Sequence, residues 1–346
     1  MKKMIPFEVS MTETYNCYSF IMGILQSYDN FKQHIWNTFL NLQSCTEKSM
    51  KELKITFTDS LWGDMWNSGM AELNLFHFSN FDRKTLKNFL TERLDSDAYL
   101  LFYSVDEYYL SYSEKYRKQH YYHDLYIYGY EDDYFLVLAY GDNKLEKLKV
   151  KSSEIIDCVL KTKMDSITDF CSFRLSKAAN IVIDPGHIAD VLEDYLLSQN
   201  HTEEQGKVYG LEVWRYVRNS VSSYAKRNIY DSSSFDLRVF RIIWEHKKIM
   251  KARIEYLCEG FNFEERILSE LNEIESRAYL AFRLAIKYSV DARHSSECLV
   301  KILQIYEELE EKERAIYPEI IKELRREADD NKRDSENPED RRPKAV

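Results

Sequence analysis

The stretch HYYHDLYIYGYEDDYFLVLAY, residues 120–140, contains two aromatic-rich apolar runs separated by a short acidic turn. The first run covers 123–129 and the second 134–140. Alternating runs of this length on either side of a turn predict a β-hairpin, so we expect both in one antiparallel sheet. His123 stands at the start of the first run. A buried strand does not need an imidazole at its first position, so we ask which groups His123 contacts.

The pattern changes near residue 200, which predicts two domains. Before it, the expected strands are 55–62, 98–105 and 171–177, and the expected helices are 17–28 and 185–198, with Asp184 as N-cap and Pro185 at the first helical position. After it, helical periodicity covers 208–225, 236–260, 264–290 and 296–328. We therefore expect an α+β domain over 1–200, a helical domain over 201–328 and a disordered charged tail over 329–346.

Composition excludes several classes of protein. Hydrophobic residues make up 44% and charged residues 31% of the 346, which is typical of a globular chain. A net charge of −10 disfavours nucleic acid as a partner. No apolar run approaches the length of a membrane span, and the N-terminus lacks the apolar segment of a secretory signal. The six cysteines include no CxxC pair, which predicts neither disulfides nor a metal site and favours the cytoplasm.

Cys17 lies at the start of an amphipathic segment whose apolar residues recur with helical spacing. We expect Thr14 or Asn16 to cap its first turn. A thiol in that position is close to the positive end of the helix dipole, which stabilises a thiolate. The alternative is that Cys17 is a small core residue at the start of a helix, as most intracellular cysteines are.

The order of Cys17, His123 and a later polar residue is that of a papain-like Cys–His–Asp/Asn site. The histidine takes the thiol proton, and a third group orients the ring. Asp142, just past the second hairpin strand, is the predicted third residue, and Asn143 is the alternative. His123 could instead be a strand-end histidine that bonds only to backbone. We expect His120, which precedes the alternating run, to contribute little.

The sequence resembles the butirosin biosynthesis protein H N-terminal-like family, a papain-like group of nonribosomal peptide and related assembly lines. The resemblance rests on NCYSF (16–20), VDEYYL (105–110), YRKQHYYHDLYIYGYEDD (116–133) and FDLRVFRIIWEHKKIMKARIEYL (235–257). It implies a papain-like fold, in which a central helix lies against an antiparallel sheet, followed by a helical domain. It also implies a Cys17 acyl-enzyme that takes an acyl or peptidyl group from a carrier protein's phosphopantetheine thioester and passes it to an amine. That reaction needs no cofactor beyond the phosphopantetheine on the carrier, and belongs to antibiotic biosynthesis.

Two positions differ from the pattern of that family. Many members have an aspartate in the second hairpin strand, where Ala139 and Tyr140 stand here. Related peptidases have a glutamine six residues before the cysteine, where this chain has Met11. We therefore expect the oxyanion hole to use the backbone N–H of Cys17 together with the side chain of Asn16 or Thr14.

Other segments supply candidate binding residues. We expect Trp62 and Trp66, together with Tyr109, to form an aromatic pocket, and Asp106 or Glu107 to receive a cationic amine. The alternative is that these residues belong to ordinary core or surface.

The helical half supplies a candidate docking surface. Glu245–Lys248 (EHKK), Arg238 and Arg253 are the predicted basic surface for a carrier protein or its phosphate. A solvated helix face is the alternative for that segment. The last long helix is a candidate homodimer interface.

Three classes of function therefore remain open. The first is a carrier-dependent N-acyltransferase, and the second is a cysteine peptidase, amidase or thioesterase that uses the same residues with water as acceptor. The third is a non-catalytic scaffold of the same pathway.

Overall fold

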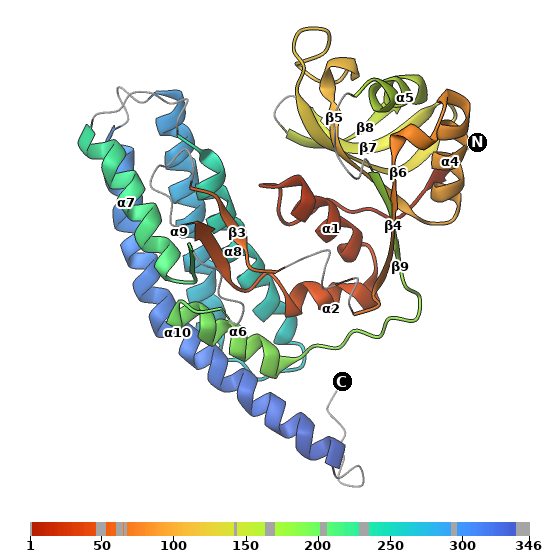
Figure 1. Cartoon of the computed structure of the whole chain (residues 1–346). Coiled ribbons are helices and arrows are strands. Elements are labelled where there is room, and N and C mark those ends of the chain that lie inside the picture. The colour runs from red at the N-terminus through yellow and green to blue at the C-terminus, as the bar shows by residue number, and fades with distance from the viewer. Residues whose placement is uncertain are drawn as a thin grey trace. The chain divides into compact units, whose positions relative to one another are not determined.

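We describe a computed structural model of the chain, which covers residues 2–45, 53–59, 65, 68–141, 144–162, 170–200, 206–227, 235–291 and 296–336 (Figure 1). The chain divides into two compact units. Unit 1 comprises residues 1–32 and 60–181, and unit 2 comprises residues 33–59 and 182–346. The architecture is α+β, as predicted: one unit contains an antiparallel sheet with helices, and the other is mainly helical.

Unit 1 is built on an antiparallel sheet. Its described strands, in spatial order, are β4 (Ala71–Phe76), β9 (Phe170–Leu175), β5 (Tyr99–Asp106), β6 (Tyr122–Glu131), β7 (Tyr134–Gly141) and β8 (Lys144–Lys151), with β1 (Lys2–Met4) paired to β6. β6 and β7 are the predicted hairpin, paired from Glu131↔Tyr134 to Tyr126↔Leu138. The prediction that residues 123–129 and 134–140 share one sheet is therefore confirmed.

Aromatic side chains join helix α1 (Asn16–Gln26) to one face of this sheet. The Phe20 ring stacks on Tyr126 of β6, with centroids 4.3 Å apart, and meets Tyr99 of β5 edge-on at 5.8 Å. Leu125 and Ile127, which alternate with Tyr126 along β6, are fully buried on the opposite face. The sheet therefore has both faces covered, and the start of α1 is held beside the start of β6.

The remaining helical elements of unit 1 surround the sheet. They are α4 (Arg83–Asp95), α5 (Ser152–Lys161) and the short 3₁₀ turns η1 (Phe78–Asn80) and η2 (Glu107–Tyr109). α4 and α5 pack against each other and against strands of the sheet. α2 (Asp29–Asn37) contains the boundary at residue 32, and its last five residues belong to unit 2.

Unit 2 combines long helices with a small sheet. Its helices are α6 (Pro185–Leu197), α7 (Glu212–Arg227), α8 (Leu237–Leu257), α9 (Glu265–Val290) and α10 (Ser296–Glu336), and its strands are β10 (Lys207–Tyr209), β2 (Leu42–Cys45) and β3 (Ile55–Phe57). Asp184 caps α6, with Pro185 in its first turn, as predicted. The helices expected over 236–260, 264–290 and 296–328 are confirmed as α8, α9 and α10.

The domain boundary predicted at residue 200 differs from the division in the structure. Strand β3, expected in the α+β domain, pairs with β2, which pairs in turn with β10 of unit 2. α6 packs along α10. Residues 33–59 and 182–200 therefore belong with the helices, because their pairing partners lie far along the chain.

The disordered tail predicted from residue 329 was placed too early. α10 continues as a helix to Glu336, and residues 337–346 lie outside the described part of the chain. The extension is rich in charged residues with good helix propensity, and Arg333 pairs with Asp330 at 3.6 Å.

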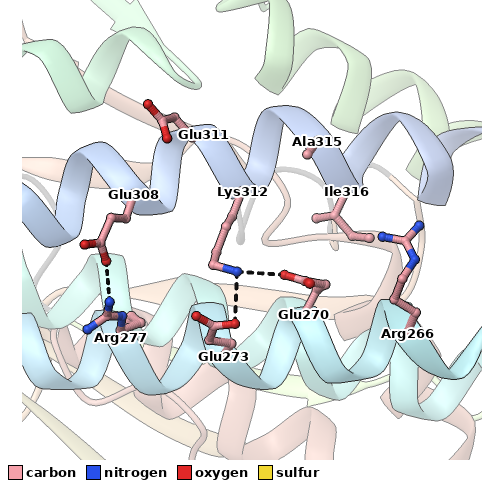
Figure 2. A pocket seen from close by; sticks show the side chains of 9 residues that line it. All are labelled: Arg266, Glu270, Glu273, Arg277, Glu308, Glu311, Lys312, Ala315 and Ile316. Carbon is pink, nitrogen blue, oxygen red and sulfur yellow. Dashed lines mark hydrogen bonds and ion pairs between the residues drawn. The ribbon is translucent and has the colours of Figure 1, made fainter.

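Ion pairs connect α9 and α10 along a shallow groove of about 460 Å³ (Figure 2). Lys312 lies between Glu270 and Glu273, 2.9 Å from each, and Arg277 pairs with Glu308 at 2.5 Å. These side chains are partly exposed, so each pair adds little to stability. Their spacing matches the register in which α9 and α10 pack.

A buried polar cluster lies in the core of unit 2. The Lys247 ammonium pairs with the Glu313 carboxylate, and both side chains are fully buried. The Tyr195 hydroxyl accepts from Lys247 at 2.9 Å and donates to Glu313 at 2.8 Å, and Trp214 donates to Tyr195 at 3.0 Å. A buried pair is tolerated only when its remaining hydrogen-bonding groups are satisfied, as they are here.

Candidate active site

His123 is positioned by the pairing of β5 with β6. Val105 pairs with His123 and Asp106 with Tyr122, so the end of β5 lies beside the start of β6. The register shifts between Phe102 and Val105, and Ser104 in this bulge has φ +56°. A bulge bends a strand and re-aims its side chains. Glu107, the first residue after β5, is thereby brought to His123.

Glu107 is the carboxylate that contacts His123. Its Oε1 lies 3.3 Å from His123 Nδ1, and its Oε2 accepts from the Ser113 hydroxyl at 2.6 Å. The Glu107 side chain is 9% exposed, and its backbone N–H donates to the Tyr121 carbonyl at 2.8 Å. A carboxylate is only an acceptor, so the contact with Glu107 favours the tautomer with the proton on Nδ1 and a lone pair on Nε2. This is the tautomer that a general base requires.

Asn16 stands at the other nitrogen of the same ring. Its Nδ2 is 3.4 Å from His123 Nε2, which is an acceptor in the tautomer that the contact with Glu107 favours. Asn16 is the first residue of α1, and Cys17 follows it in the first turn. The predicted cap is wrong: Tyr15 is the N-cap residue and makes no side-chain capping bond. The side chain of Asn16 bonds to the histidine instead.

Cys17 is half-buried in this first turn. Burial, and then the charges of Asp124 and Cys17, raise the pKa of Tyr126 well above its usual value. The Cys17 sulfur therefore lies within electrostatic range of the Tyr126 hydroxyl, on the face of the sheet that α1 covers. Asn16, the neighbour of Cys17 in the chain, contacts His123, so the structure brings the start of α1 to this histidine.

Tyr140 is a neighbour of His123 that was not predicted as a site residue. Its ring centroid lies 5.7 Å from the imidazole, and its hydroxyl donates to the Glu13 carbonyl at 2.6 Å. Its ring supplies packing against the imidazole. Its partner Glu13 immediately precedes the buried Thr14, which is the other predicted oxyanion residue.

Asp106 and His120 form a second imidazole–carboxylate pair. Asp106 Oδ2 is 2.7 Å from His120 Nδ1, and its Oδ1 accepts from the backbone N–H groups of Tyr108 and Tyr121 at 3.1 and 3.4 Å. Asp106 is 2% exposed and satisfied within the chain, which does not fit the predicted role of receiving an amine. Glu107 departs from that role as well, because it contacts His123. His120, expected to contribute little, stacks on Tyr108 at 4.5 Å.

The other predicted residues have different outcomes. Asp142, Asn143, Trp62 and Trp66 lie outside the described residues, and their assignments remain predictions. Tyr109 belongs to η2, and Lys161 lies 5.3 Å over its ring.

The basic surface predicted around residues 245–253 is wrong, because several of its members are buried. Arg253 is fully buried, and its guanidinium donates to the carbonyls of Trp36 and Thr38. Lys247 and Glu245 are each 1% exposed. Arg238 pairs with Asp236 at 2.7 Å, next to the start of α8.

The described ranges contain neither a candidate metal-binding cluster nor a helix that could span a membrane. No group of three or more His, Cys, Asp and Glu side chains there could hold a metal ion. None of the described helices has the length and apolar content needed to cross a bilayer.

No family model matches the sequence, and no curated protein matches it at a significant level.

Proposed function

We propose that the chain is a cysteine-dependent acyltransferase with a papain-like catalytic unit. Cys17 receives an acyl or peptidyl group from the phosphopantetheine thioester of a carrier protein and passes it to a small-molecule amine. The single observation that supports this most strongly is His123, held between Glu107 and the residue next to Cys17. The carrier thioester, the amine acceptor and a place in antibiotic biosynthesis follow from the sequence resemblance.

In the first half-reaction, the Cys17 sulfur attacks the thioester carbonyl carbon. A new C–S bond forms, and the bond to the pantetheine sulfur breaks. His123 takes the thiol proton at Nε2 and gives a proton to the departing pantetheine thiolate. Glu107 keeps Nδ1 protonated and stabilises the imidazolium that forms. Backbone N–H groups in the first turn of a helix point out of its N-terminal end. The N–H of Cys17, together with the side chain of Asn16, is therefore suited to stabilise the oxyanion.

In the second half-reaction, the amine nitrogen attacks the acyl-enzyme carbonyl, and an amide bond replaces the bond to Cys17. The proton lost by nitrogen passes to His123, and the Cys17 thiolate leaves.

Covalent labelling tests the nucleophile. Incubation with an acyl-loaded carrier protein should add the acyl mass to the peptide that contains Cys17, and Cys17→Ala should abolish both labelling and turnover. Cys45, an exposed free cysteine in unit 2, provides the matched control, because Cys45→Ala should label as fully as the parent. Full activity in Cys17→Ala would refute the assignment.

Product analysis separates transfer from hydrolysis. His123→Ala should slow acylation by about 10²- to 10⁴-fold, the usual contribution of a positioned base. With an amine present, the product should be the amide. Formation of the free acid at the same rate with and without amine would identify a peptidase, amidase or thioesterase. A protein that acquires no label from any thioester would be a non-catalytic member of the pathway.

A further inference from the structure

The loop over residues 110–119, between η2 and β6, is built directly onto the histidine's carboxylate partner. Its Ser113 hydroxyl donates to Glu107 Oε2 at 2.6 Å and accepts from the Lys115 backbone N–H at 3.1 Å. The Arg117 N–H donates to the Tyr108 carbonyl at 3.0 Å. These bonds fix the loop as the rim of the proposed active site.

This rim is positive in a protein whose net charge is −10. Its cations are Lys115, Arg117 and Lys118, and its one acidic residue is Glu114. Arg117 and Lys118 are exposed. Across the described part of the chain, no carboxylate lies within 4.0 Å of any of the three cations, whereas many lysines and arginines elsewhere are ion-paired. A positive rim on an acidic chain directs an anionic partner to that rim.

Arg117 is held in a fixed orientation within the loop. Its backbone has φ +56°, a left-handed conformation that costs a non-glycine residue energy and persists only when its surroundings impose it. The guanidinium lies 5.4 Å over the Tyr116 ring and 5.7 Å over the Tyr108 ring. Side-chain hydrogen bonds with Tyr116 and Tyr108 take up part of the five guanidinium N–H groups, and the others can donate to a phosphate.

Ring contacts connect this cationic rim to the catalytic histidine. The Lys115 ammonium lies 6.0 Å from the Tyr121 ring centroid, and the Tyr121 ring is 5.9 Å from that of His123. We propose that Arg117, with Lys115 and Lys118, binds the phosphate of the donor's phosphopantetheine arm and so docks the acidic carrier protein. This inference rests on the proposed function and replaces the docking surface predicted on α8.

A pair of small donors isolates the role of the phosphate. The rate of Cys17 acylation is measured with acetyl-phosphopantetheine and with acetyl-pantetheine. We expect the parent to prefer the phosphorylated donor by about tenfold, the effect of one charge-assisted hydrogen bond. Arg117→Gln should reduce that preference to about twofold or less, with the acetyl-pantetheine rate unchanged. Arg283→Gln is the matched control, since Arg283 is exposed and lies 5.9 Å over Tyr279 in unit 2.

Several outcomes would overturn the proposal. One is a parent enzyme without preference for the phosphorylated donor, and another is a preference that persists in both Arg117→Gln and Lys115→Gln/Lys118→Gln. Inorganic phosphate that inhibits as strongly as phosphopantetheine would indicate a general anion site and refute the assigned partner.

With an acetylated acyl carrier protein as donor, KM should rise about tenfold in Arg117→Gln and increase with salt, while kcat is retained.

Failure of the proposed function is recognisable separately. In that case no donor acylates Cys17, in the parent or in any variant. The affinities of Cys17→Ser for phosphopantetheine and for pantetheine, measured by calorimetry, then test whether the loop over residues 110–119 binds the phosphate. Tighter binding of the phosphorylated compound that is lost in Cys17→Ser/Arg117→Gln would support the site, and equal binding of the two compounds would refute it.

Discussion

Replacing Glu107 by glutamine keeps the size of the side chain and removes the charge that faces His123. Two unit charges 3.3 Å apart interact by about 5 kcal/mol at an effective dielectric constant of about 20 and by about 1 kcal/mol in water. The carboxylate is nearly buried but the imidazole is 31% exposed, so we place the loss between these limits, at about 2–3 kcal/mol. The rate of Cys17 acylation should therefore fall about 30- to 150-fold, since 1.36 kcal/mol is a factor of ten.

The assay is the single-turnover acylation of Cys17 by an acyl thioester, followed by intact mass. Glu107→Asp should retain more activity than Glu107→Gln, because it keeps the charge at a longer distance. Asp142→Asn tests the residue that the sequence suggested for the same task. The reasoning is refuted if Glu107→Gln acylates at the parent rate and Asp142→Asn is instead slowed about 30- to 150-fold. The third catalytic residue would then be Asp142.

Three further predictions concern stability. His120→Ala should lower the melting temperature, because it leaves the buried Asp106 carboxylate without its imidazole partner. The acylation rate should change by no more than about threefold, because His120 acts only indirectly. A loss of rate equal to that of His123→Ala would contradict this. Burial, and then the charge of His187, lower the pKa of His34 to about 4, below its usual value near 6.5. Between about pH 6.5 and pH 4, His34 therefore binds a proton in the unfolded state but not in the folded state. The contribution of His34 to stability is complete above about pH 6.5 and is lost as the pH falls toward 4. His34→Leu should flatten the pH dependence of the free energy of unfolding, measured by chemical denaturation, in that window. Glu313→Gln leaves the Lys247 ammonium buried and unpaired and should cost about 3–5 kcal/mol in the free energy of unfolding, whereas Glu313→Gln/Lys247→Met should recover much of it; equal losses would contradict the pairing.

Local patterns in the sequence predicted the elements whose contacts are close along the chain. The hairpin of β6 and β7, the cap at Asp184 and the long helices of unit 2 depend on turn chemistry and on 3.6-residue periodicity, which a single segment reveals. The placement of β3 failed because β3 pairs with β2, and β2 pairs in turn with β10 from beyond residue 200. Pairing between distant segments cannot be predicted from the sequence of a three-residue strand. The prediction that Arg253 lies on the surface failed for a related reason. The carbonyl groups that accept from its guanidinium belong to α2 and to the residues after it, which lie far from Arg253 in the sequence.

In the candidate site, the order of residues led to the prediction of Cys17 and His123, but it did not point to Glu107 as the carboxylate that contacts the imidazole. A search for a third residue after the histidine passes over Glu107, which precedes it in the chain and reaches it through antiparallel pairing. The signal was present as two acidic residues directly after the strand-like run 98–105, followed by a histidine at the start of the next strand. Antiparallel neighbours place the end of one strand beside the start of the next. The tautomer set by Glu107 and the contact with Asn16 required coordinates.

The composition of unit 2 has a consequence for biosynthesis of the chain. Residues 33–59 leave the ribosome early, whereas β10, α6 and α8, which pair with or bury them, are translated only after the whole of unit 1. The sheet of unit 1 therefore has all its strands available while Leu42, Ile55 and Phe57, fully buried in the finished protein, still lack their cover. Such exposed apolar segments are the usual point of entry for aggregation and for chaperones. A gene fragment that ends near residue 181 would keep that exposure permanently, so separate expression of unit 1 calls for removal of residues 33–59 and a short turn in their place.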